Sequence, residues 1–178
     1  MFNFGKKKEV KAIEKFFEDN MHIFNPPSSF VGYEIKNESK ENLTNICKVL
    51  TNNLVDMQKV NFEDKNEFVD SLVELKYITG DFQQQYNLVE IVRGINEIAN
   101  NLNYSIKLSE KDVLDQDDET KKHVREKCAY LTSHDLNICA ELLEQQGYEL
   151  FQVSTDVEGY NMSLLPKSKI EELKQFTE

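Results

Sequence analysis

Cysteine is scarce in this chain of 178 residues, which contains only Cys47, Cys128 and Cys139. The three are far apart in the sequence and form no CxxC pair. An odd number of separated cysteines does not indicate a disulfide framework, and all three fall on the apolar side of predicted helices. We therefore expect reduced, buried thiols in a cytoplasmic protein.

Long apolar runs are also missing. No stretch approaches the roughly 18 apolar residues that a membrane-spanning helix needs. The opening MFNFGKKKEVKAIEKFF carries lysines, but no apolar core follows them, so it does not predict a secretory signal. Residues 1–7 are expected to form a flexible tail ahead of the first helix.

Basic residues are outnumbered, with 21 Lys and Arg against 32 Asp and Glu and a net charge of -11. This balance disfavours sequence-independent nucleic-acid binding, which depends on bases that neutralise phosphates. It equally disfavours docking on anionic membranes. An acidic surface can steer a basic protein partner toward itself, which is the partner class that we predict. A monomer and a homodimer both fit the sequence.

The common catalytic and phosphate-binding motifs are absent: there is no GxSxG, Walker loop, GxGxxG or HExxH. Cys128, His134 and Cys139 are close in sequence, and Asp135 could orient an imidazole. A thiol on an apolar face stays protonated and unreactive, however, and the spacing fits no common zinc pattern. We predict no catalytic residue, no metal ligand and no cofactor, and hence a protein that is not an enzyme.

Segments rich in Gly, Pro or Ser that could divide the chain are lacking, so residues 1–178 are predicted to form a single domain. Apolar residues recur at helical spacing in most of the chain, and at period two in a few short stretches. The fold class is therefore α+β, mostly helical, with a small antiparallel sheet. Strands are expected at 30–36, 104–108, 148–154 and 160–165, and helices at 8–19, from Ser39 to Met57, after an N-cap at Asn61, and at 81–102, 119–131, 134–146 and 168–176.

Negative charge is concentrated between Glu110 and Glu119, where six acids and one lysine give a net charge of -5. The next residues, KKHVREK, are basic, so part of the acidic run fits the start of a helix. Asp118 and Glu119 suffice for that role. We therefore predict that a partner is recognised at this segment, where Asp112, Asp115 and Asp117 are free to meet its Lys or Arg and Asp118 and Glu119 belong to the same site. Asp115, Asp117 and Glu126 also match three calcium-loop positions, but Thr120 stands where that loop needs glycine.

The stretch STDVEGY, residues 154 to 160, separates the two C-terminal strands. Asp156 and Glu158 could form a small acidic site for a partner, or they could belong to the turn of a hairpin. Gly159 supplies the positive φ that such a loop commonly needs, which favours the turn. Phe151 and Val153 on one strand, with Tyr160, Met162 and Leu164 on the other, are expected to form one buried face.

The run LNICAELLEQQGYELFQVSTDVEGYNMSLLPKSKIEELKQF, residues 136 to 176, resembles the C-terminal helix–hairpin–helix segment of small bacterial cytoplasmic proteins of unknown function, some classed with toxin-immunity families. The resemblance rests on packing residues and implies no catalytic residue. It implies a bacterial, non-enzymatic protein that binds another protein, as immunity or inhibitor proteins do. The alternative is a small enzyme or ligand-binding domain with a pocket between the sheet and the long helix.

Overall fold

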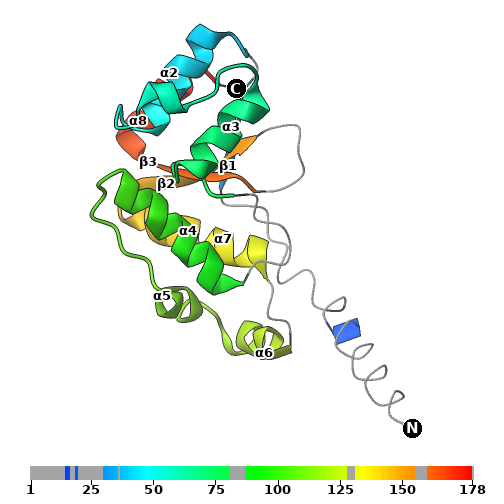
Figure 1. Ribbon diagram of the computed structural model, residues 1–178. Helices are drawn as coiled ribbons and strands as arrows, with labels where there is room; N and C mark the ends of the chain where they lie inside the picture. Colours follow the sequence, from blue (N-terminus) through cyan, green and yellow to red (C-terminus); the bar gives the residue numbers. More distant parts are fainter. Residues whose placement is uncertain are drawn as a thin grey trace.

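The computed structural model describes residues 15, 16, 19, 30–35, 37–80, 87–127, 131–154 and 160–177. Several predictions lie outside these residues. They are the tail at 1–7, most of the helix at 8–19, the start of the long helix at 81–86, Cys128, and the turn that carries Asp156 and Glu158. The described residues have the α+β architecture that the sequence predicts, with helices packed around a small sheet (Figure 1).

The sheet has three strands in the order β1 (Val31–Glu34), β2 (Tyr148–Ser154) and β3 (Met162–Pro166). Strands β2 and β3 form the predicted antiparallel hairpin, and Phe151 lies opposite Ser163. Strand β1 pairs with β2 in parallel, so the sheet is mixed and not purely antiparallel as expected. A parallel neighbour has to come from a distant part of the chain, because a tight turn cannot connect parallel strands.

Both faces of the sheet are buried, contrary to the single buried face predicted from the alternation. Directly paired residues point to the same side, so Phe151 shares a face with Ser163, whereas Leu150 shares the other with Leu164. Phe151 and Met162 therefore lie on opposite faces. All five of these side chains are buried. Helices α2 and α8 cover one side of the sheet and α4 and α7 the other (Figure 1).

The helices on the first side are shorter than predicted. Helix α2 (Lys40–Leu50) begins as expected at Ser39, whose side chain accepts a hydrogen bond from the Asn42 backbone at 3.3 Å. It ends at Leu50, so Leu54 is exposed, and a 3-10 turn, η1, follows at Met57–Lys59. Helix α3 (Lys65–Glu74) is capped by Asp64 and not by Asn61, and α8 spans Lys167–Leu173.

On the other side, α4 (Leu88–Asn101) begins with a capping box between Asn87 and Glu90. Val89 is apolar but exposed, because it lies on the outer side of the first turn. Helix α7 (Thr132–Gln145) has its C-cap at Gln146 and is followed by Gly147, which has φ of 86°. Only glycine adopts this left-handed conformation readily, so it allows the chain to turn directly into β2.

Residues 104–108 are not a strand, although Ile106 and Leu108 are buried as the alternation predicts. The Asn96 side chain of α4 takes the place of a strand partner. Its amide donates to the Leu108 carbonyl at 2.8 Å, and its oxygen accepts from the Leu108 N–H at 3.1 Å. A side-chain amide can thus satisfy the hydrogen-bonding groups of a buried backbone segment without a neighbouring strand.

The outer edge of β3 is covered by the segment that follows α3. The Thr79 N–H donates to the Met162 carbonyl at 2.8 Å, and the Thr79 hydroxyl accepts from the Met162 N–H at 2.9 Å. The Ser163 hydroxyl donates to the Tyr77 carbonyl at 3.1 Å. These bonds fix residues 77–80 beside the outer edge of the sheet.

Two of the three cysteines are described, and both are buried and free of a disulfide. Burial raises the pKa of the Cys47 thiol to about 11, and burial likewise raises the pKa of the Cys139 thiol. Neither is a thiolate near neutral pH, so neither should react readily. Separately, no helix among the described residues is both long and apolar enough to cross a membrane.

Thiol labelling checks this burial. In the native protein a thiol-reactive reagent should label Cys47 and Cys139 slowly, because only opening of the fold exposes them, and in denaturant it should label all three cysteines at once. Peptide mapping assigns each label to its residue. Fast native labelling of Cys139 would contradict its buried position on the inner side of α7.

Candidate functional site

The acidic run from 110 to 119 forms two short helices, α5 (Glu110–Leu114) and α6 (Glu119–Lys127). Asp112 was expected to have no local role, but it completes a capping box at the start of α5. Its carboxylate accepts from the Ser109 N–H at 2.9 Å, and the Asp112 N–H donates to the Ser109 hydroxyl at 3.2 Å. The hydrogen bonds from Ser109 lower the pKa of Asp112, so this exposed carboxylate stays ionised.

Asp118 and Glu119 lie at the start of α6, as predicted. The Asp118 carboxylate accepts from the Lys121 N–H at 2.9 Å, which is the bond expected of a capping acid. Glu119 is exposed and lies 3.5 Å from Lys122, one turn further along the helix. Asp115 is exposed and has no ion-pair partner among the described residues.

For Asp117 the prediction of a free, accessible carboxylate is wrong. The residue is only 4% exposed, and its carboxylate is bound within the chain. Arg125 of α6 donates from Nε to Asp117 Oδ2 at 2.9 Å, and His134 Nε2 lies 2.7 Å from Asp117 Oδ1. The physical reason is that a buried carboxylate needs charged or polar partners, and Arg125 and His134 provide them. Asp117 therefore cannot meet a partner's base.

Arg125 joins Asp117 to a second buried acid, Asp135, at the start of α7. Its Nη2 lies 2.8 Å from Asp117 Oδ2 and 2.7 Å from Asp135 Oδ1. Burial would raise the pKa of Asp117, but the hydrogen bonds from His134 and Arg125 outweigh it and lower that pKa. For Asp135, burial prevails and raises the pKa despite Arg125. We name Asp117, Arg125, His134 and Asp135 the buried charge cluster.

Two members of the buried charge cluster, His134 and Asp135, are also residues that the sequence places near Cys128 and Cys139 as candidates for cysteine–histidine catalysis. Asp135 binds Arg125 and does not orient His134, because Asp117 holds that ring. His134 is only 3% exposed, which keeps it away from a molecule in solution. The contacts of Arg125 instead attach α6 to α7. Apolar packing adds little to this attachment, because among the described residues of α6 only Val124 is buried.

A shallow groove of about 330 Å³ lies between α5 and α7. Asp112, Asp115 and Gln116 line it from the α5 side, and the side chains of the C-terminal turn of α7 line it from the other. Leu108 and Leu142 supply its apolar part, and Lys107 adds one base to a lining that otherwise carries two acids. The structure thus brings Asp112 and Asp115 to the rim of one concave surface, which we name the α5–α7 groove.

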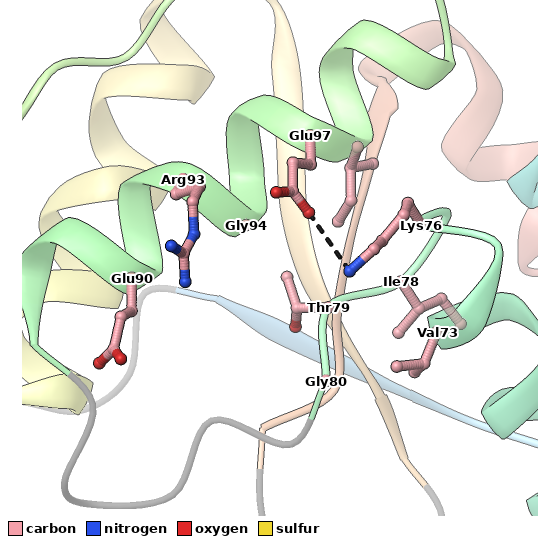
Figure 2. A pocket seen from close by; sticks show the side chains of 10 residues that line it. Val73, Lys76, Ile78, Thr79, Gly80, Glu90, Arg93, Gly94 and Glu97 are labelled. Atoms are coloured by element: carbon pink, nitrogen blue, oxygen red, sulfur yellow. Dashed lines mark ion pairs between the residues drawn. The ribbon is translucent and has the colours of Figure 1, made fainter.

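A second cleft, also of about 330 Å³, lies between α4 and the end of α3 with the segment that follows it, residues 73–80. Glu90, Arg93 and Glu97 project into it from one side of α4, toward Thr79 and Gly80 (Figure 2). Lys76 reaches in from the end of α3 and lies 3.5 Å from Glu97. We name this the α4 cleft. It lies beside the edge of β3 that Thr79 covers, close to the position between the sheet and the long helix where a ligand-binding domain was predicted to have its pocket.

Lys76 has a backbone φ of 63°, in the left-handed region that favours glycine. It occupies the position just after the C-cap Leu75, where glycine is the usual residue. Here the chain instead carries a long cation that reaches the α4 cleft. No protein-family model, curated protein or solved structure matches the chain.

Proposed function

We propose that this is a non-enzymatic protein that binds a basic segment of another protein in the α5–α7 groove. The observation that carries the proposal is the placement of Asp112 and Asp115. Both carboxylates lie on the rim of a concave surface that also has an apolar part, formed by Leu108 and Leu142. A flat acidic surface would attract cations without positioning them.

The groove suits a lysine or arginine side chain. Such a side chain has an apolar stem and a charged head, and the two ends favour different surroundings. The stem would cover Leu142 while the head meets the carboxylates of Asp112 and Asp115. The amides of Gln145 and Gln146 on the opposite rim add acceptors for the remaining N–H groups.

We further propose that the protein is a bacterial immunity or inhibitor protein of the cytoplasm. The resemblance of residues 136–176 to bacterial immunity-like proteins supports the functional class. The buried, unpaired thiols of Cys47 and Cys139 support a reducing compartment. An inhibitor of this kind acts by covering a basic surface on its target, for which electrostatic attraction speeds the encounter.

Peptide selection tests the proposal. Binders selected from a random dodecapeptide library on the native protein should be enriched in Lys and Arg. With such a peptide, the double variant Asp112→Asn and Asp115→Asn should slow association about 10-fold at low salt, because it removes the steering charge. Added salt should shrink the difference by screening. Association and dissociation rates are measured on the immobilised protein.

Asp70→Asn is the matched control, because it removes an exposed carboxylate from α3, away from the groove. It should bind the peptide like the unaltered protein. The proposal would be wrong if the selected peptides showed no excess of basic residues, or if the control and the double variant slowed association equally.

A further inference from the structure

Arg93 is the basic residue of the α4 cleft that lacks an ion-pair partner among the described residues. Glu90 and Glu97 lie three residues before it and four after it on α4, at spacings that commonly give ion pairs. Yet among the described residues Arg93 has no carboxylate within ion-pair distance. Its exposed guanidinium points into the open space of the cleft (Figure 2).

The two neighbouring carboxylates already have other contacts. Glu90 accepts a hydrogen bond from the Asn87 N–H at 3.1 Å in the capping box that starts α4. Glu97 lies 3.5 Å from Lys76, in an exposed pair that is worth little and can open. Arg93 therefore offers a fork of donors to an incoming group, and a planar carboxylate matches that fork in geometry.

Charge balance selects among the anions that could bind. The four charged side chains of the cleft, Lys76, Glu90, Arg93 and Glu97, sum to zero. A phosphate dianion would gain from Arg93 and Lys76 but would be repelled by the two glutamates. A molecule with one carboxylate and one ammonium group finds a partner for each, since Glu97 and Glu90 can accept from the ammonium.

Size and shape agree with a small molecule. The cleft volume of about 330 Å³ is at the lower end of the range typical of ligand sites. Glycines lie on both walls, Gly80 on the segment beside the sheet and Gly94 on α4, so neither contributes a side chain that would fill the space. Val73 adds an apolar surface.

We propose that the α4 cleft binds a free amino acid, with the ligand carboxylate on Arg93 and its ammonium group on Glu97. Lys76 lies at the ammonium end of the site, and its exposed pair with Glu97 opens when the ligand ammonium group binds. The site is separate from the α5–α7 groove, and the proposal does not depend on the protein-binding function.

Titration of the full-length protein with each of the common amino acids, followed by backbone amide shifts in NMR, tests the site. At least one amino acid should shift residues 73–80 and 88–98 at millimolar concentration. Arg93→Gln should weaken that binding about 10-fold or more, because it removes a charge-assisted pair. Glu97→Gln should weaken it as well, whereas Lys48→Gln, which removes an exposed charge from α2, should have no effect.

Three further probes distinguish the ligand class: the N-acetyl form of the binding amino acid, its amide, and inorganic phosphate. Each should bind much more weakly than the amino acid itself. The proposal is overturned if no amino acid shifts the cleft residues, if the N-acetyl form or phosphate binds as well as the parent, or if Arg93→Gln and Lys48→Gln behave alike. Native-like amide spectra of the variants establish that they are folded.

Discussion

Substituting Arg125 by methionine should lower the free energy of unfolding by about 3–5 kcal/mol, the usual cost of removing one partner of a buried ion pair. The guanidinium contacts Asp117 and Asp135, and both carboxylate side chains are fully buried. Without it, two negative charges would remain near His134 in a poorly solvated place. Urea-induced unfolding, followed by circular dichroism, measures the loss.

Lys127→Met is the control, since it removes an exposed base from the same helix and should change the stability by less than about 0.5 kcal/mol. A triple variant isolates the cause. Adding Asp117→Asn and Asp135→Asn to Arg125→Met removes the uncompensated charges and should recover part of the lost stability. If the triple variant is less stable than Arg125→Met alone, uncompensated charge is not the source of the loss.

Truncating Phe151 to alanine should destabilise the protein by about 3–5 kcal/mol, the range for a large aromatic residue in a core. Phe151 is fully buried on the central strand β2, and its ring lies 5.2 Å from that of Tyr33 in an edge-to-face contact. The cavity would lie where β1, β2 and a covering helix layer meet, so the surroundings cannot easily close it. Chemical unfolding gives the difference in stability.

Two further alanine variants show whether both faces of the sheet are core. Leu150→Ala, on the opposite face of β2, should cost about 2–5 kcal/mol, because that face is buried too. Val31→Ala, in register with Phe151 on β1 but half exposed, should cost less than about 1 kcal/mol. A near-neutral Leu150→Ala would mean that only one face packs, as the simple alternation suggested.

The hairpin shows what the alternation of apolar residues can and cannot predict about a strand. The strand predicted at 148–154 has the bounds of β2, whereas the one predicted at 160–165 begins too early, because β3 starts at Met162. The assignment of faces was wrong because alternation reveals the buried side only when the other side is polar. In β3 the residues Met162 to Leu165 are all buried, so their sequence carries no such contrast.

The segment at 104–108 shows a different limit. Ile106 and Leu108 are buried, but the strand predicted from their alternation is absent from residues 104–108, because alternation does not determine what the backbone pairs with. Here the partner is the Asn96 side chain, and nothing near residue 108 in the sequence indicates it. The N-cap of α4 could have been predicted from the sequence, because Asn87 followed by Glu90 is a recognisable capping box.

The buried charge cluster could be anticipated only in part. A helix such as α6, with Val124 as its only buried residue, needs some other attachment, and Arg125 beside it was an available candidate. The sequence could not show that Asp117 and Asp135 face this arginine from two sides. The acids of the run lie in different surroundings, and Asp112 and Asp115 are the two that line the groove.

The parallel pairing of β1 with β2 has a consequence for protein synthesis. Tyr33 and Glu149, joined by a 2.7 Å hydrogen bond, are 116 residues apart, so at about 5–20 residues per second the ribosome needs roughly 6–23 s to supply the partner of β1. During that time the nascent chain has a strand sequence with no strand beside it. A message that stops before residue 148 would yield no sheet at all, and such a product should be degraded or aggregate.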